Sequence, residues 1–342
     1  MKLFRICVAA VLALAPLGAA ADEVVLKSVS TWPSSYAVVK EYLRFVERVN
    51  ETGKGVVRID HIGGPEVVPA DQQDMAIRNG VFDIQFGAAS YYSGVVPEAD
   101  ALKASEISPI EARKSGAIAL LSGIWRKKLN AEVLAWMSGG IGFYLYLTEA
   151  PKLTDQGVPD LRGLKLRSSS AYKDWFEALG ATNVMMAPPE TFSAFERGMV
   201  DGLAATGINF RDVGVTEFIK ARVSPAVWQI DTLIVMNAGK FDALPEKARK
   251  VLVAAAIAQE TQTMEAYRAQ ADEEAAEIAE SGVQFIDLGP DAGAKYKALA
   301  HELVWERLAR NAPGNADALR RAFSRYSSQG AVDVKDASAA RP

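Results

Sequence analysis

Few side chains in this 342-residue sequence are of the types that carry out covalent chemistry. It contains one cysteine and two histidines, and His61 and His301 lie far apart along the chain. His301 opens a His-Glu-Leu-Val-Trp stretch, but Trp305 stands where a zinc-binding helix needs its second histidine. Thiolate catalysis, disulfide frameworks and multi-histidine metal sites are therefore disfavoured. Carboxylates are therefore the only candidates left for general acid–base catalysis.

Phosphate-binding motifs are also missing. The cluster Gly139, Gly140 and Gly142 lacks the spacing of a dinucleotide fingerprint, and no glycine loop ends in Gly-Lys-Ser/Thr. The 38 basic and 42 acidic residues give a formal net charge of −4, which offers no basic surface to nucleic acid. We expect no cofactor, no metal, no catalytic residues and no nucleic-acid partner.

One arginine has the surroundings of an anion site. Arg167 ends a short predicted strand after the turn at residues 160–163, and serines 168–170 follow it. A serine there is expected to cap a helix through Trp175 towards Gly180, which would set free backbone N–H groups beside Arg167. The guanidinium fork suits a carboxylate. The alternative is a surface arginine in a local ion pair.

The elements that must position this arginine alternate between strands and helices. β-branched and alternating runs predict the strands, and apolar residues at helical spacing predict the helices. Such repetition predicts an α/β fold with mostly parallel sheets and helices on both faces. The first predicted strands cover residues 24–30, 56–62 and 83–86, and the helices between them cover residues 34–51 and 69–78.

The N-terminal residues 1–21 are typical of a secretory signal peptide. Two basic residues precede the apolar run Ile6–Leu17, and Ala19–Ala21 precede Asp22. The alternative is an uncleaved N-terminal anchor. Cys7 lies inside this segment, and no later apolar run is long enough to span a bilayer. We therefore expect a periplasmic protein that does not insert into the membrane after cleavage.

Several short motifs occur in a fixed order. Asp-Leu-Arg-Gly-Leu-Lys-Leu-Arg at 160–167 precedes Glu-Thr-Phe at 190–192 and Gly-Met-Val-Asp-Gly at 198–202. Asn-Gly-Val-Phe-Asp-Ile at 79–84 comes earlier, and a Leu-Pro pair within 241–249 comes later. This succession resembles the solute-binding proteins of tripartite ATP-independent periplasmic (TRAP) transporters, over nearly all of the mature chain.

The resemblance implies a two-lobed periplasmic-binding-protein (type II-like) α/β fold with hinge strands and a long helix bridging both lobes. It implies a binding protein, not an enzyme, which captures an organic acid by lobe closure and delivers it to the small and large membrane subunits of a TRAP permease. Arg167 occupies the position whose guanidinium grips the ligand carboxylate in that family. The bridging helix matches residues 245–278, which contain no breaker. Because their apolar positions keep no strict heptad, an inter-lobe brace is favoured over the alternative of a coiled-coil or oligomer helix.

Positions at which this sequence departs from the family pattern indicate the class of ligand. Tyr144 stands where some members carry a second arginine, and aromatic residues are abundant near the expected cleft. We therefore expect a monocarboxylate with an apolar or aromatic body, although an aromatic residue taken alone is more often part of the core than of a pocket. Phe192, Phe195 and Met199 are assigned to packing, and Gln229 and Asp231 are left out of the predicted site. The predicted ligand-binding residues are Arg167, Tyr144, Trp32, Tyr91, Tyr92, Ser169, Asn209, Phe210 and Trp228.

The strand order also predicts domain limits. Hinges are expected at residues 144–150 and 230–235. Lobe I is expected to comprise residues 22–146 and 233–272, lobe II residues 147–232 and 273–328, and a mobile tail residues 329–342. Two other functions stay open from sequence: a binding protein for an ATP-driven transporter or sensor kinase, and a carboxylate-based periplasmic enzyme.

Overall fold

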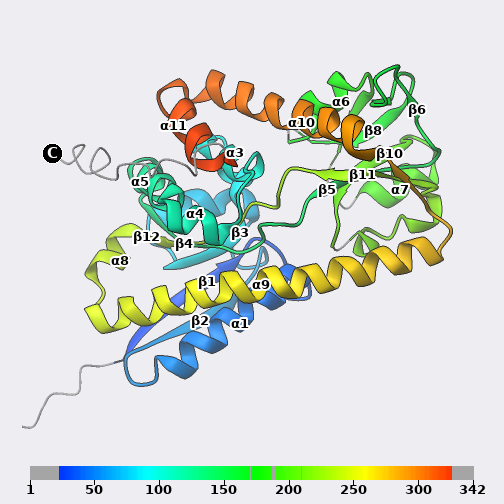
Figure 1. Ribbon diagram of the computed structural model, residues 1–342. Helices are drawn as coiled ribbons and strands as arrows, with labels where there is room; N and C mark the ends of the chain where they lie inside the picture. Colours follow the sequence, from blue (N-terminus) through cyan, green and yellow to red (C-terminus); the bar gives the residue numbers. More distant parts are fainter. Residues whose placement is uncertain (1–22, 170, 187–189, 209, 326–342) are drawn as a thin grey trace, which may run out of the picture.

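A computed structural model of the protein describes residues 23–325, except residues 170, 187–189 and 209. The expected signal peptide and the expected tail at 329–342 lie outside these described residues. The described chain forms two α/β lobes, each built around its own sheet (Figure 1). Within these ranges no helix is both long and apolar enough to span a membrane.

The first lobe contains a five-stranded sheet in the order β2-β1-β3-β12-β4. β1 (Val24–Ser30) runs parallel to β2 (Val57–Gly63) and β3 (Ile84–Ala88). β12 (Thr232–Asn237) lies antiparallel between β3 and β4 (Ala131–Trp136). Every residue of β3 and β12 is buried, as expected for central strands covered on both faces.

The second lobe contains a six-stranded sheet in the order β13-β11-β5-β10-β8-β9. β5 runs antiparallel to both of its neighbours, β10 and β11. These strands are β5 (Phe143–Leu147), β8 (Lys165–Ser168), β9 (Thr182–Met185), β10 (Gly202–Thr206), β11 (Ala221–Val227) and β13 (Gln284–Asp287). A separate small hairpin pairs β6 (Lys152–Leu153) with β7 (Pro159–Asp160).

The expectation of mostly parallel sheets is therefore corrected, because each sheet is mixed. β5 enters the second sheet directly after β4 of the first, and β12 enters the first directly after β11 of the second. Since neither strand arrives through a crossover helix within its own sheet, nothing requires it to run parallel to its neighbours.

Helices cover both lobes. α1 packs the apolar stripe Val39, Tyr42, Phe45 and Val49 into the first lobe's core. Ser108 and Glu111 form a capping box at the start of α4. The first lobe carries α1 (Ala37–Thr52), α2 (Gln73–Arg78), α3 (Asp100–Lys103), α4 (Pro109–Ser115), α5 (Ala117–Leu129) and α8 (Ala238–Ala243), and the second carries α6 (Lys173–Ala178) and α7 (Thr191–Glu196).

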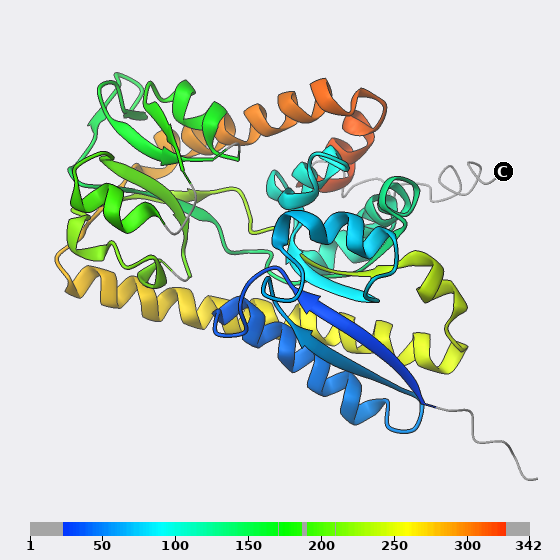
Figure 2. The same cartoon turned by 180° about the vertical axis from the view of Figure 1, so that it is seen from behind.

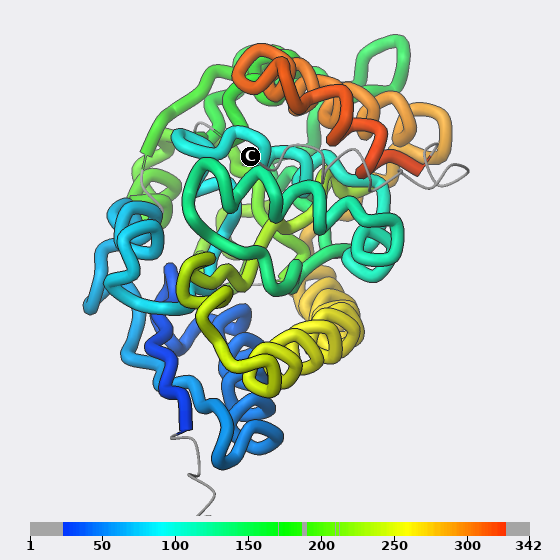
Figure 3. Tube along the Cα trace, turned by 90° about the vertical axis from the view of Figure 1, so that its left-hand side faces the viewer, coloured from blue at the N-terminus to red at the C-terminus, as the bar shows by residue number. Residues whose placement is uncertain are grey.

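Helix α9 (Glu246–Glu280) spans both lobes, as the sequence predicted (Figure 1). In the first lobe it packs along α1 (Figure 3) and its Glu260 pairs with Arg113. In the second lobe its Glu274 accepts the backbone N–H of Arg211 at 2.9 Å. The helix therefore contacts both lobes through polar side chains.

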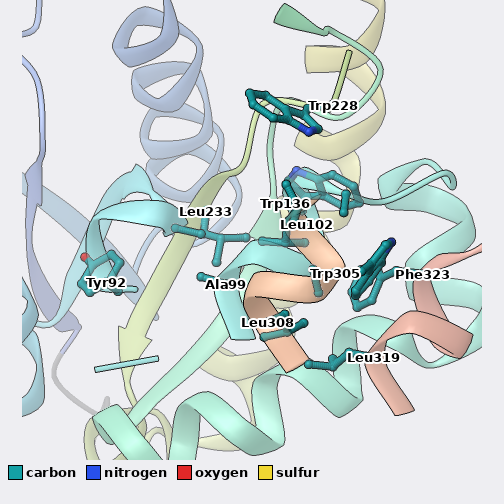
Figure 4. Close-up of a cluster of buried hydrophobic side chains, with 14 of the residues drawn as sticks. Tyr92, Ala99, Leu102, Trp136, Trp228, Leu233, Trp305, Leu308, Leu319 and Phe323 are labelled. Atoms are coloured by element: carbon teal, nitrogen blue, oxygen red, sulfur yellow. The ribbon is translucent and has the colours of Figure 1, made fainter. Parts of the chain in front are cut away.

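The C-terminal helices cross back to the first lobe, which differs from the expected assignment of residues 273–328 to lobe II. α10 (Gly289–Asn311) packs on β11 and α6 and then reaches α3, and α11 (Pro313–Phe323) packs on α3, α4 and α5. Figure 4 shows Leu308, Leu319 and Phe323 in the same buried cluster as Leu102 and Trp136. Burial of these apolar side chains fixes α11 on the first lobe.

Two extended segments, residues 137–142 and 228–231, connect the sheets beside the bridging helices (Figure 2). The expected lobe boundary after residue 146 falls inside β5, and the expected hinge at 144–150 begins within that strand. The second expected hinge, 230–235, overlaps the connector but extends into β12.

Candidate functional site

A cavity of about 740 Å³ is lined by residues of both lobes. The first lobe and its connector contribute Trp32, Tyr36, Val38, Ala88, Ser90, Tyr91, Ile230, Asp231 and Thr232. The second lobe contributes Phe143, Arg167, Ser169, Ala171, Tyr172, Met186, Thr191, Phe192, Leu203, Ala204, Ala205, Thr206 and Val213.

The cavity lies at the ends of strands in both sheets. Trp32, Ser90 and Ser169 come after the carboxyl ends of β1, β3 and β8. Asp231 precedes β12, and Phe143 begins β5. Because these two strands are antiparallel to their neighbours, their starts meet the carboxyl ends of the parallel strands. This edge is where open α/β sheets bind ligands.

Arg167 is the cation of the cavity. It lies in β8 between Leu203 of β10 and Val184 of β9, and only 8% of it is exposed. Its Nη2 donates to the Met186 carbonyl at 3.1 Å, while its buried Nε has no hydrogen-bond partner within the part of the chain that the structure describes. Among the described residues it forms no ion pair. A buried guanidinium with unused donors is suited to bind an anion.

Asp231 faces the same cavity from the other lobe. Its Oδ2 accepts the Ser90 N–H at 2.7 Å, and 5% of the residue is exposed. Burial raises the pKa of Asp231, whereas the Lys103 ammonium and the Ser90 N–H oppose that increase. Asp231 is not among the site residues predicted from the sequence.

Aromatic rings form much of the wall. Trp32 and Tyr91 pack with ring centroids 5.9 Å apart on the first lobe, and Phe143 and Tyr172 pack at 5.8 Å on the second. Behind the second pair lies the Lys103 ammonium, which donates to the Ala171 carbonyl at 2.8 Å. The cavity therefore combines one guanidinium group with broad apolar surface.

Four predicted site residues line this cavity: Arg167, Trp32, Tyr91 and Ser169. Asn209 is outside the described residues. The expected serine cap is absent, because Tyr172 occupies the N-cap position of α6 without a side-chain hydrogen bond. Arg167 therefore does not lie beside a helix that begins with a serine cap.

Two predicted wall residues face away from the cavity, for reasons of local geometry. Tyr92 is buried against Trp125, with centroids 5.0 Å apart, and lies in the core cluster of Figure 4. It follows Tyr91 in a single 3₁₀ turn, where successive side chains point about 120° apart. Tyr144 lies beside Tyr146 and over the Arg222 guanidinium. It shares a strand with Phe143, and neighbouring strand residues point to opposite faces.

The other two misplaced residues also pack internally. Phe210 is fully buried, with its ring stacked on Tyr146. Trp228 lies in the main core cluster (Figure 4), and its indole N–H donates to the Ala300 carbonyl at 2.8 Å. Its backbone has a φ of 58°, a left-handed conformation that turns the side chain toward Trp175 and α10.

Several residues that line the cavity are not among those predicted from the sequence. Phe143 and Tyr172 are not among the predicted site residues, and Phe192 was assigned to packing although it is 43% exposed. Asp231 had a recognisable signal, a carboxylate immediately before an apolar strand. The face occupied by each aromatic had no such signal.

A second cavity, of about 1040 Å³, is lined by Trp228, Gln229, His301 and residues of α10. Arg167 and Asp231 do not line it. Across the described ranges, no group of three or more histidine, cysteine, aspartate or glutamate side chains could hold a metal ion.

The two lobes, the connecting segments and the charged cavity between the lobes define a solute-binding protein of the two-lobed periplasmic type. Residues 28–311 match the family model for bacterial extracellular solute-binding proteins, family 7 (DctP). The chain belongs to this family, the extracytoplasmic binding proteins of TRAP transporters, which are not enzymes. The expected fold class, family and extracytoplasmic localisation are confirmed.

Relatives are distant in sequence. A solute-binding protein of Albidiferax ferrireducens is 23% identical over 77% of this chain and 78% of its own length. A monocarboxylate 2-oxoacid-binding periplasmic protein of Nostoc is 20% identical over 83% of this chain and 79% of its own. DctP7 of Bordetella pertussis, crystallised as a receptor that binds pyroglutamic acid, has a TM-score of 0.72 at 17% identity, covering 87% and 99% of the two chains.

Proposed function

We propose that this protein captures a monocarboxylate with an apolar or aromatic body in the periplasm and delivers it to the membrane subunits of a TRAP permease. The observation that carries the proposal is Arg167, which is buried, forms no ion pair with another described residue, and lines a cavity whose wall contains several aromatic rings. The Nostoc relative is named as a monocarboxylate 2-oxoacid-binding protein, and the Bordetella receptor binds pyroglutamic acid. Both kinds of ligand carry a carboxylate, the group that this proposal assigns to Arg167.

The cavity also suggests how binding leads to closure. Arg167 belongs to the second lobe, whereas Trp32 and Tyr91 belong to the first. A ligand can contact all three of these side chains only when the lobes approach each other. It therefore stabilises the closed state by the difference between its affinities for the two states.

A panel of organic acids in a thermal-shift assay tests the proposal. A carboxylate at about 100 times its dissociation constant should stabilise the protein by roughly 2.7 kcal/mol. For an acid found in this way, Arg167→Ala should weaken binding measured by calorimetry by about 2–5 kcal/mol. Arg167→Lys should weaken it as well, because an ammonium cannot reproduce the guanidinium fork.

Arg162→Ala provides the matched control, since Arg162 is a highly exposed arginine paired with Asp160 outside the cavity. Its removal should leave the affinity unchanged. Shifts with sugars or amines but with no carboxylate would refute the anion site. Unchanged affinity in both Arg167 variants would refute the assigned role of that residue.

A further inference from the structure

Asp231 and Arg167 place opposite charges on opposite lobes of one cavity. Asp231 is held in position twice: its backbone carbonyl accepts the Ala89 N–H at 2.8 Å, and its Oδ2 accepts the Ser90 N–H at 2.7 Å. Both hydrogen bonds come from the turn that follows β3, so the carboxylate is fixed to the first lobe. Arg167 is fixed to the second lobe by its place within β8.

The two charges do not satisfy each other. Among the described residues, neither Arg167 nor Asp231 forms an ion pair, although both are more than nine-tenths buried. Burying charged groups without partners is costly. A cavity that keeps a guanidinium and a carboxylate apart is therefore complementary to a molecule that brings a partner for each.

The neighbours of Asp231 use only part of its capacity to accept hydrogen bonds. Ser90 donates its backbone N–H to Oδ2 at 2.7 Å, and the Ser90 side chain also hydrogen-bonds the carboxylate. Lys103 is a cation whose charge favours the ionised form of Asp231, but its ammonium donates to the Ala171 carbonyl and lies 3.8 Å from the centre of the Trp228 ring. A carboxylate can accept about four hydrogen bonds, so acceptor sites remain for a ligand.

We infer that the ligand carries, beside its carboxylate, a hydroxyl or N–H group that donates a hydrogen bond to Asp231. This inference rests on the proposed function and narrows its substrate class. Asp231 also selects against dicarboxylates, because a second ligand carboxylate at this end of the cavity meets a like charge in a poorly solvated site.

This arrangement assigns the two ligand groups to different lobes. The carboxylate binds Arg167 of the second lobe, and the donor group binds Asp231 of the first. A donor-bearing acid therefore links the lobes through directional contacts. A donor-free acid keeps its contact with Arg167 but leaves Asp231 buried without its partner, so it favours closure less.

Pairs of acids that differ in a single donor test the inference by calorimetry. Pyroglutamate and its lactone analogue, 5-oxotetrahydrofuran-2-carboxylate, differ in an N–H replaced by oxygen, and 3-phenyllactate and 3-phenylpropanoate differ in one hydroxyl. The donor-bearing member of a pair that fits the cavity should bind about 10- to 100-fold more tightly. Small-angle scattering should show greater compaction with the donor-bearing member.

Asp231→Asn should narrow the difference within the pair and raise the affinity for phenylsuccinate, a dicarboxylate, because the variant removes the charge but keeps the shape. Asp83→Asn is the matched control, because Asp83 lies at the opposite end of β3 and pairs with Lys240. This substitution should leave the affinity ratio within each pair of acids unaltered. The measurements on the native protein do not depend on whether Asp231→Asn folds.

Equal affinity within each pair in the native protein would overturn the inference. An unchanged ratio in folded Asp231→Asn would also overturn it. In both cases carboxylate binding that depends on Arg167 would leave the proposed function intact. Failure of the native protein to bind any carboxylate would overturn the proposed function and the inference together.

Discussion

Replacing Lys103 should change how the stability of this protein depends on pH. The residue is 3% exposed, and its ammonium makes one hydrogen bond, to the Ala171 carbonyl, and contacts the faces of Trp228 and Tyr172. Burial, with the nearby Arg307 guanidinium, lowers the pKa of Lys103 to about 7, whereas Asp100, Asp231 and Asp174 act in the opposite direction.

Proton binding decides whether the free energy of unfolding rises or falls with pH. An unfolded lysine has a pKa near 10.4, so between pH 7 and that value the unfolded chain holds a proton that the folded chain releases. The free energy of unfolding therefore rises with pH in this window and falls as pH drops toward 7. With about half a proton difference at pH 7 and nearly one at pH 9, Lys103 adds about 2 kcal/mol of stability over this interval.

Urea unfolding of native protein and Lys103→Met at several pH values between 6 and 9.5 measures this effect. The variant should gain most relative to native protein near pH 7, and its advantage should shrink by about 2 kcal/mol by pH 9. Lys54→Met, at an exposed turn, changes the net charge equally and serves as the control. A native–variant difference that stays constant from pH 7 to 9 would refute the reasoning.

Two further predictions concern stability. Glu260 is buried and binds Arg113 through two oxygens, each at 2.7 Å, so Glu260→Ala should cost about 3 kcal/mol in chemical unfolding. Glu246→Ala, at the exposed start of the same helix, should change the midpoint little; equal effects would contradict the buried-pair argument. Ser108→Ala should cost about 1 kcal/mol by removing the capping box with Glu111, and an unchanged thermal midpoint would exclude that contribution.

Local sequence determined most of the elements. The strand predicted at 24–30 is β1, and the unbroken helix predicted at 245–278 is α9 (Glu246–Glu280). Both depend on patterns that a short window contains: a β-branched run, and good helix formers without glycine or proline. Arg167 was also within reach of the sequence, because a strand end followed by polar residues is a local pattern.

Only the tertiary structure decided which neighbours of these elements face the cavity. Tyr91 and Phe143 line it, while Tyr92 and Tyr144 pack elsewhere. Both members of each pair are aromatic, and both faces of the sheets are covered, so hydrophobic alternation carries no signal for the face. The cavity side of each pair is set by the strand and turn that hold it.

Long-range contacts decided the rest. Asp231 lies opposite Arg167 because the chain returns from the second lobe and β12 pairs with β3. This pairing brings Asp231 into contact with Ser90, which precedes it by 141 residues. α11 returns to the first lobe because its apolar residues complete that lobe's core. The sequence by itself determined the elements and pointed to one charged side chain of the cavity, Arg167. The pairing of distant strands determined the second charge and the walls around it, because contacts between distant residues leave no periodic trace within the segments that make them.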